Sequence, residues 1–295
     1  MTYLHFIVNP ISGNGKHHLG ETMLRQFFPE SEYRIAVDYT KHKGHAKTLT
    51  ESIIKLHPDC IVACGGDGTI SEVASGLVDS VIKLAIVPVG SGNGLASNLG
   101  IPQSVPAALD TIKNGTVAFI DVGKVNQRYF FSNMGIGVDA KIIKRYERTG
   151  KRTLSAYIAA TLRESFRFAP RQTMLAYNNQ IDSQMPFLLF VSNSNEMGYG
   201  MSLTPEAKLN DGKLDLLLVP QISLFRKLQL GYSVLSKKTK RFSKSTHTTF
   251  TNLVLEQQET IYMDVQIDGE FHNLKTNKLT IDVLHKALRV VVPIV

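Results

Sequence analysis

The sequence predicts two domains: an α/β domain with a doubly wound parallel sheet, followed by a β-sandwich. Strand and helix patterns alternate up to about residue 125, and from Asn126 onward short strand patterns dominate. The chain has 295 residues, and single hydrophobic cores seldom grow beyond roughly 250 to 300 residues. We therefore expect an α/β domain over residues 1–125 and a sandwich over residues 126–285, with residues 286–295 as a candidate to return to the first domain.

In the first domain, short apolar runs that end at turn signals predict strands, and apolar residues at helical spacing predict helices. The expected strands cover residues 3–8, 33–39, 60–64, 84–89 and 117–125. The expected helices cover residues 17–28, 46–56, 69–77 and 105–113. Such alternation is typical of parallel sheets, whose ligands bind at the carboxyl ends of the strands.

The second domain reads as a series of strands interrupted by two helical patterns. The expected strands cover residues 128–132, 171–181, 187–193, 213–219, 248–255, 260–267, 278–283 and 288–292. Helices are expected over residues 138–168, with a break near Gly150, and over residues 224–236.

Composition narrows the class of protein. No apolar stretch approaches the ~18 to 20 residues of a membrane span, and the N-terminus lacks the pattern of a secretory signal, so we expect a cytoplasmic protein. Cys60 and Cys64 lie on one expected strand about 13 Å apart, too far for a disulfide. The net charge of +8 and pI near 9.3 favour an acidic partner, nucleic acid or anionic lipid. Without a recognition motif, nucleic acid is not expected.

The turn Gly65-Gly66-Asp67-Gly68-Thr69 lies between an expected strand and an expected helix. Glycines let the backbone approach a ligand, and the amides at a helix start favour an anion such as phosphate. Asp67 adds a carboxylate, which suits Mg²⁺ binding or proton acceptance from a hydroxyl. The alternative is an ordinary turn in which Thr69 caps the helix.

Two further glycine-rich turns follow expected strands, at residues 12–16 and 90–96. The first does not have the spacing of the common phosphate loop. Because the carboxyl ends of parallel strands share one edge of a sheet, all three turns should lie together there. This clustering favours a nucleotide or phosphate site.

The motifs Asn9-Pro10-Ile11-Ser12-Gly13-Asn14-Gly15-Lys16, Gly65-Gly66-Asp67-Gly68-Thr69 and Pro88-Val89-Gly90-Ser91-Gly92-Asn93-Gly94-Leu95-Ala96 together resemble the diacylglycerol kinase catalytic-domain family, which includes sphingosine and ceramide kinases. The resemblance implies ATP and Mg²⁺ as cofactors, a fold similar to NAD kinase and phosphofructokinase, and an ATP site in a cleft between the domains. By position the site would use Asn9, Ser12, Gly13, Asn14, Gly15, Lys16, Thr40, Gly65, Gly66, Asp67, Gly68, Thr69, Ser71, Glu72, Ser91 and Asn93.

Alternatives stay open both for single residues and for the function. Thr40 could merely end a strand, Asn93 could serve its turn, and Lys16 could be a solvated charge. The central turn is shared with NAD kinases, so a kinase that phosphorylates NAD is one rival, and a non-catalytic lipid-binding regulator is another. Gly94 and Ser97 replace an aspartate and an arginine that many bacterial diacylglycerol kinases carry, which leaves the acceptor open between diacylglycerol and a sphingoid base.

In the second domain, Asp268-Gly269-Glu270 resembles the catalytic Asp-Gly-Glu of the family, with Asp268 or Glu270 as proton acceptor beside Asp67. Its alternative is a plain Asp-Gly hairpin turn. Odd positions from 261 to 267 are apolar and even positions are polar, which predicts a strand with one buried face and one polar face. Asp211-Gly212 resembles the structural Mg²⁺ site of the family, with the Asp211 carboxylate and the carbonyls of Lys208 and Lys213 as ligands. Asp121 is expected to join this acidic network.

A soluble kinase with a lipid alcohol as substrate must reach a membrane surface. One basic helix face is expected from Lys141, Lys144, Arg145 and Arg148, continued by Lys151 and Arg152, and an apolar stripe from Leu154, Tyr157, Ile158 and Leu162. A second basic cluster comprises Lys237, Lys238, Lys240, Arg241 and Lys244. We expect peripheral association with the anionic inner face of the membrane, with ordinary solvated surface as the alternative. The oligomeric state is open, with a homodimer as one alternative.

Overall fold

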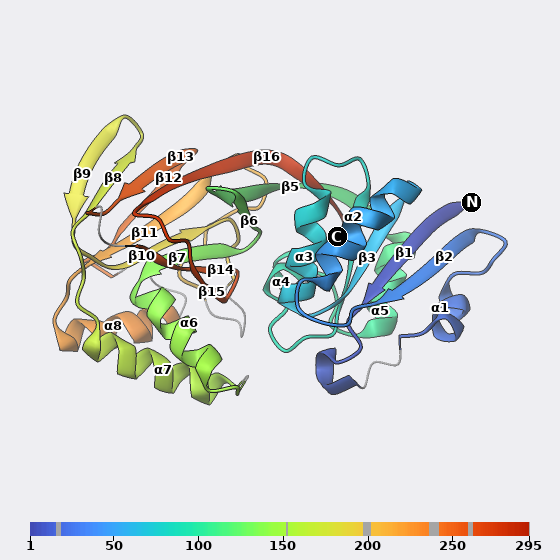
Figure 1. Cartoon of the computed structure of the whole chain (residues 1–295), viewed down its shortest axis with the longest axis horizontal. Helices are drawn as coiled ribbons and strands as arrows, with labels where there is room; N and C mark the ends of the chain where they lie inside the picture. The colour runs from blue at the N-terminus through green and yellow to red at the C-terminus, as the bar shows by residue number, and fades with distance from the viewer. Residues whose placement is uncertain (16–18, 152, 197–201, 236–241, 259–261, 295) are drawn as a thin grey trace. The chain divides into compact units, whose positions relative to one another are not determined.

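The structure is a computed structural model that describes residues 1–15, 19–151, 153–196, 202–235, 242–258 and 262–294. It divides into two compact units, shown in Figure 1: unit 1 is Met1–Ile120 with Lys286–Val295, and unit 2 is Asp121–His285. The sequence predicts a boundary after residue 125. In the structure the first segment of unit 1 ends at Ile120, five residues earlier. Two strands, β5 (Thr116–Val125) and β16 (Lys278–Val292), each pass from one unit into the other.

The core of unit 1 is a parallel sheet with the order β2-β1-β3-β4-β16. Its strands are β1 (Thr2–Val8), β2 (Tyr33–Tyr39), β3 (Cys60–Gly65) and β4 (Lys83–Pro88), and β16 joins β4 through Val290 and Leu84. β1, β3 and β4 are buried along nearly their whole length, as in sheets covered by helices on both faces. This confirms the predicted α/β class.

The helices of unit 1 follow the strands in sequence. They are α1 (Glu21–Phe27), α2 (His45–Ile53), α3 (Asp67–Leu77), α4 (Gly94–Asn98) and α5 (Val105–Asn114), with short 3₁₀ turns at Ser12–Gly15 and Ile54–Leu56. α3 begins at Asp67 with Gly66 as its N-cap, two residues before the expected start, which rules out the alternative in which Thr69 caps the helix. The helix expected over residues 17–28 corresponds to α1, which begins at Glu21, and residues 16–18 lie outside the described part of the chain. Both cysteines are buried and free, and burial raises the pKa of Cys60 to about 12.

Unit 2 contains two sheets that enclose an apolar core, which confirms the predicted sandwich. One sheet has the order β16-β13-β8-β9, with β5 pairing β16 and β6; the other has the order β12-β11-β10-β7-β14-β15. Buried side chains such as Ile136, Leu189, Leu253 and Ile281 fill the space between them. The remaining strands are β6 (Arg128–Phe130), β7 (Asn133–Gly137), β8 (Thr173–Tyr177), β9 (Gln180–Gln184), β10 (Pro186–Ser192), β11 (Leu214–Pro220), β12 (Thr246–Phe250), β13 (Asn252–Glu256), β14 (Asp264–Ile267) and β15 (Glu270–Asn273).

Several expected strand boundaries in unit 2 were wrong. The expected strand over residues 171–181 is the hairpin of β8 and β9, because Asn178 and Asn179 take positive φ and turn the chain. The expected strand over residues 248–255 is likewise two strands, β12 and β13. By contrast, the two strands expected over residues 278–283 and 288–292 are the single strand β16.

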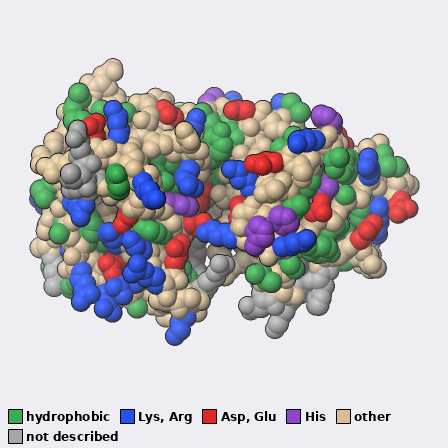
Figure 2. Space-filling model, viewed as in Figure 1, with side chains coloured by type: hydrophobic (Ala, Val, Ile, Leu, Met, Phe, Trp, Pro, Cys, Tyr) green, Lys and Arg blue, Asp and Glu red, His purple; other side chains and the backbone are tan. Residues whose placement is uncertain are grey.

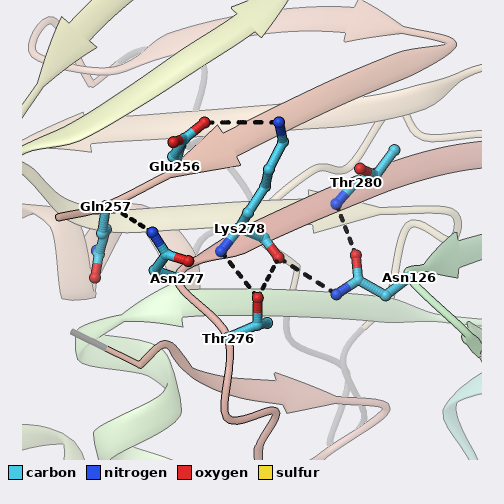
Figure 3. A network of polar contacts seen from close by, with 7 residues as sticks. All are labelled: Asn126, Glu256, Gln257, Thr276, Asn277, Lys278 and Thr280. Carbon is cyan, nitrogen blue, oxygen red and sulfur yellow. Dashed lines mark hydrogen bonds and ion pairs between the residues drawn. The ribbon is translucent and has the colours of Figure 1, made fainter. Parts of the chain in front are cut away.

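Polar contacts join the ends of several strands in unit 2 (Figure 3). The side chain of Asn126 accepts a hydrogen bond from the Thr280 amide at 2.8 Å and donates to the Lys278 carbonyl at 3.4 Å. Asn277 donates to the carbonyl of Gln257 at 3.0 Å. These side chains take the place of strand pairing where the ladders end.

Three helices cover one face of the six-stranded sheet, as Figure 1 shows: α6 (Val138–Arg148), α7 (Leu154–Arg167) and α8 (Leu224–Leu235). Their apolar residues form a second core with the sheet, which includes Val138, Ala160, Phe190 and Leu230. The break between α6 and α7 contains Gly150 at φ 65°, as predicted from the sequence. Among the described helices, none has both the length and the hydrophobicity of a membrane span.

Candidate functional site

The three glycine-rich turns of unit 1 follow β1, β3 and β4, which are parallel neighbours in the sheet. They therefore lie at one edge, as the sequence predicts. Glycines allow the turns to touch. A Cβ on Gly66 would lie 3.2 Å from the Cα of Gly90, and a Cβ on Gly13 would lie 2.5 Å from the Val89 carbonyl oxygen. Gly13 also has φ 58°, a conformation that side chains disfavour.

Asp67 links the second turn to the third. Its carboxylate oxygens accept hydrogen bonds from the backbone amides of Asn93 at 2.8 Å and Gly94 at 2.7 Å. A Cβ on Gly92 would lie 2.7 Å from the same carboxylate, so only glycine permits this approach. The half-buried Asp67 thus has a structural role as well as the position of a candidate catalytic group.

The first turn is joined to α3 by Asn9. Its side-chain amide donates to the Thr69 hydroxyl at 3.1 Å, and its backbone amide donates to the Cys64 carbonyl at 2.9 Å. Thr40 lies at the end of β2, where its amide donates to the Val8 carbonyl at 2.9 Å. Asn9, Thr40 and Thr69 therefore lie at the same edge of the sheet.

Asn93 is buried in left-handed conformation, and its side chain is used within its own turn. It accepts from the Gly90 amide at 3.1 Å and donates to the Gly90 carbonyl at 2.7 Å and to Gln103 Oε1 at 2.8 Å. This supports the alternative in which Asn93 serves the turn. Gln103 was missed because nothing in its sequence surroundings marks a contact with a turn ten residues earlier.

Glu72 of α3 caps the N-terminus of helix α2. Its two oxygens accept from the Gly44 amide at 2.7 Å and the Ala46 amide at 3.1 Å, at the start of α2. Of the other residues expected in the ATP site, Ser91 is exposed, whereas Ser12 and Ser71 are half-buried. Lys16 lies outside the described residues, as does the side chain of Asn14.

In unit 2, Asp268 and Gly269 form a two-residue hairpin turn between β14 and β15, both at positive φ. The Asp268 carboxylate accepts from the amides of Phe131 at 2.9 Å, Ser132 at 2.8 Å and Asn133 at 3.1 Å. The turn is therefore anchored to the start of β7, and the half-buried Glu270 opens β15 directly after it. The expectation of a polar face on β14 was wrong at Gln266, which is only 2% exposed.

A buried carboxylate lies next to Gln266. Asp139 in the first turn of α6 is buried, and its Oδ2 has no hydrogen-bond partner among the described atoms. Burial raises the pKa of Asp139 to about 7, and a hydrogen bond from Gln266 partly offsets this. A Cβ on Gly135 would overlap this carboxylate, so the sequence signal for the contact is a glycine in a strand.

The expected metal ligands lie on an exposed loop before β11. Asp211 accepts from the Lys213 amide at 3.1 Å, and both Asp211 and Lys208 are exposed. The buried Asp121 accepts from the Gly212 amide at 2.6 Å and contacts His285 Nδ1 at 2.8 Å, a partner that the sequence did not indicate. No cluster of three or more His, Cys, Asp or Glu side chains suited to a metal occurs within the described ranges.

The basic face expected on α6 is largely used inside unit 2. Lys141 and Lys144 pair with Asp264 at 2.6 and 3.6 Å, and Arg145 pairs with Glu164 of α7. Of the expected apolar stripe, Tyr157 is half-buried against Tyr146, whereas Leu154, Ile158 and Leu162 are exposed. In the second basic cluster, residues 237–241 lie outside the described residues, as does Arg152 of the first.

Known families match both units. The family described as diacylglycerol kinase catalytic domain matches residues 3–125. The family described as YegS C-terminal NAD kinase β-sandwich-like domain matches residues 132–292, more than half of the chain.

Named relatives agree with these matches. A diacylglycerol kinase of Bacillus subtilis (strain 168) is 28% identical over 97% of this chain and 95% of its own length. One of Staphylococcus aureus (strain JH9) is 28% identical over 90% of this chain and 85% of its own length.

Two solved structures from Bacillus anthracis str. Sterne share the fold. One, described as a candidate diacylglycerol kinase, has a TM-score of 0.78 at 23% identity over 99% of this chain and 95% of its own. The other, described as a diacylglycerol kinase, has a TM-score of 0.71 at 21% identity over 99% and 96% of the two chains.

Proposed function

Since the chain belongs to the family that joins a diacylglycerol kinase catalytic domain to a YegS-type C-terminal domain, we propose that it is an ATP-dependent lipid kinase. It transfers the γ-phosphate of ATP to the hydroxyl of a membrane lipid such as diacylglycerol or a sphingoid base. The observation that carries the proposal is the edge of unit 1 where Asp67 joins two glycine turns through the amides of Asn93 and Gly94. At this edge, glycines let the backbone come close to a ligand, and backbone amides at strand ends and helix starts bind phosphates.

The residues of unit 1 hold the phosphates rather than react with them, since phosphoryl transfer depends mainly on positioning and charge neutralisation. Gly13, Gly66 and Gly90 keep side chains out of the space next to the backbone. Asn9 fixes the first turn to Thr69 of α3, so the turns form one rigid surface. This rigidity keeps donor phosphates in line with an incoming hydroxyl.

For the acceptor hydroxyl, we assign the role of proton acceptor to Glu270 rather than Asp268. Asp268 already accepts three backbone amides, which suits it to shaping the turn. Glu270 follows at the first position of β15, where a carboxylate can take a proton as the new bond forms.

The oxygen donors of the Asp211 loop fit Mg²⁺, since Asp211 is an exposed carboxylate in a loop that also offers backbone carbonyls. In this proposal Asp211 and the carbonyls of Lys208 and Lys213 hold the ion, and the Asp121 contact to Gly212 shapes the loop. A separate Mg²⁺ that accompanies ATP would supply charge neutralisation of the transferring group.

The test is incubation with radiolabelled ATP and a panel of vesicle-borne diacylglycerol, monoacylglycerol, ceramide and sphingosine, with NAD as the rival acceptor. Label in a lipid that is lost in Glu270→Gln supports the proposal. Label in NAD alone would identify an NAD kinase, and no label in any acceptor would leave a non-catalytic member of the family.

We further propose that unit 2 docks on an anionic membrane through α7 and α8. Leu154, Ile158, Leu162 and Phe166 repeat every four residues along α7 and are 40% to 57% exposed. On α8, Phe225, Leu228 and Tyr232 are 56% to 76% exposed. The helices are neighbours, because Lys227 of α8 donates to the Ser165 carbonyl of α7 at 2.5 Å.

The chemistry that fits this ridge is an anionic lipid surface. Figure 2 shows Lys and Arg side chains gathered over the helical layer of unit 2. Exposed cations flank the apolar ridge, namely Arg148, Lys151, Arg163 and Arg167. Each cation near an anionic leaflet contributes about 1 kcal/mol, and buried apolar side chains add to this.

Vesicle co-sedimentation tests the docking. We expect binding to vesicles with anionic lipid that weakens in 1 M salt, where the Debye length is about 3 Å. Ile158→Ser with Leu162→Ser, or Arg163→Gln with Arg167→Gln, should reduce binding, whereas Ile181→Ser changes an exposed apolar residue of β9 and should not. Equal binding by all of these variants would exclude the ridge as the docking surface.

A further inference from the structure

Helix α6 holds the hairpin of β14 and β15 from both of its strands. On β14, Asp264 Oδ2 pairs with Lys141 at 2.6 Å and Lys144 at 3.6 Å. On β15, the Phe271 amide donates to Glu147 Oε1 at 2.9 Å, and the Lys144 ammonium lies 4.4 Å from the centre of the Phe271 ring. About two turns of one helix, from Lys141 to Glu147, thus contact both four-residue strands of the hairpin.

A buried polar chain holds the inner side of the same hairpin. Gln266 accepts from the Gly269 amide at 2.8 Å and donates to Asn133 Oδ1 at 2.6 Å. The turn at Asp268 and Gly269 is therefore fixed to β7 through Gln266 and Asn133.

The hairpin depends on these contacts for its position. β15 ends the order of the six-stranded sheet and has four residues, and two-stranded hairpins of this size are marginal on their own. Burial acts to raise the pKa of Asp264, but hydrogen bonds from Lys141 and Asn273 and the charges of Lys141 and Lys144 outweigh it and hold the pKa below its ordinary value. The carboxylate is thus stabilised in its charged form by α6.

We propose that α6 positions Glu270 for catalysis, with Lys141, Lys144 and Glu147 as positioning residues that act through Asp264 and Phe271. The inference rests on the proposed lipid kinase function and on Glu270 as its proton acceptor. These lysines thereby have a role inside the protein in place of the membrane contact that the sequence suggests. Misplacement of a catalytic group by about 1 Å can cost on the order of a hundredfold in rate.

Steady-state kinetics with matched variants test the proposal. We expect Lys141→Gln with Lys144→Gln, and separately Asp264→Asn, to lower kcat about ten- to a hundredfold, with KM for ATP and binding to anionic vesicles unchanged. Combining the lysine substitutions with Asp264→Asn should lower kcat little further, because each change removes the same ion pairs between α6 and Asp264. Lys275→Gln also replaces a lysine by glutamine, at an exposed site just beyond β15, and should not lower kcat.

A conservative pair of substitutions at Glu147 gives a second readout. Glu147→Gln keeps an oxygen acceptor for the Phe271 amide and should retain kcat, whereas Glu147→Ala removes the acceptor and should lower it. Hydrogen exchange at Gly269 and Phe271 should rise in Asp264→Asn, a measurement that does not depend on kinase activity. Wild-type kcat in Lys141→Gln with Lys144→Gln, or a loss that Lys275→Gln shares, overturns the positioning role. An inactive wild-type protein instead overturns the proposed function.

Discussion

The Asp67 carboxylate accepts a hydrogen bond from the backbone amide of Asn93 at 2.8 Å. This bond joins two glycine-rich turns that are separated in the sequence by a helix and a strand. One residue therefore holds the two turns together and supplies negative charge at this edge of the sheet. The structural and chemical roles of Asp67 can be separated by mutation, because one depends on its oxygen atoms and the other on its charge.

Asp67→Asn should abolish kinase activity and also lower stability. The sequence alone suggests an unchanged fold, since the shapes match, but the new amide nitrogen would face a backbone donor. An unsatisfied buried donor costs about 1 to 3 kcal/mol. Urea unfolding should show this loss, whereas Glu51→Gln, an equal change of charge at an exposed position of α2, should unfold like wild type. Full activity in Asp67→Asn would exclude this carboxylate from the reaction.

Gly92→Ala should disturb the same link without removing the charge. The added Cβ would lie 2.7 Å from Asp67 Oδ2, so the carboxylate or the turn must shift. We expect a higher KM for ATP and a lower kcat, measured by initial rates. Gly231→Ala is the control, because its Cβ meets no atom within 4 Å. Unchanged kinetics in Gly92→Ala would mean that the third turn does not contribute to ATP binding.

Asp139→Asn should stabilise unit 2 more at pH 8 than at pH 5. Burial raises the pKa of Asp139 to about 7, so the folded state favours the protonated carboxyl. That stabilisation is complete below the ordinary carboxyl pKa of about 4 and is lost as pH rises through about 7. The asparagine stays neutral throughout. Its advantage in unfolding free energy should therefore grow by about 1.4 kcal/mol per pH unit up to pH 7. An advantage independent of pH, as expected for the exposed control Asp110→Asn, would contradict burial as the cause.

Mg²⁺ should raise the melting temperature of the wild-type protein, and a chelator should lower it. A ligand that binds only the folded state stabilises it by mass action, about 2.7 kcal/mol at a hundred times its Kd. In Asp211→Ala the ion should have little effect on melting. If the wild type and Asp211→Ala respond equally to Mg²⁺, the ion binds elsewhere.

The parts of the fold that depend on local signals were predictable. The strands before each glycine turn are short apolar runs, and the helices after them have regular apolar spacing, so their order and the shared edge followed from the sequence. β7, β15 and α4 were missed because each has four or five residues, too few for a periodic pattern.

The site was predictable as a set of turns but not as a set of contacts. The motif residues Asn9, Asp67 and Asp268 could be named from the sequence, whereas their hydrogen bonds depend on register between distant segments. The partner of Lys141 is the clearest case. Its helical spacing is typical of a solvated basic face, and only the packing of α6 on β14 reveals Asp264 at 2.6 Å.

The pairing of β16 with β4 sets the order in which the chain can fold during synthesis. Val290 meets Leu84 in the parallel sheet of unit 1, so this sheet lacks a strand until all of unit 2 has been synthesised. Until then β4 presents an unpaired edge, which is prone to associate with other chains. Parallel pairing between such distant segments is also slow. Chaperone protection should therefore matter most before residues 286–292 pair with β4, and a variant that ends at His285 should leave the sheet of unit 1 incomplete.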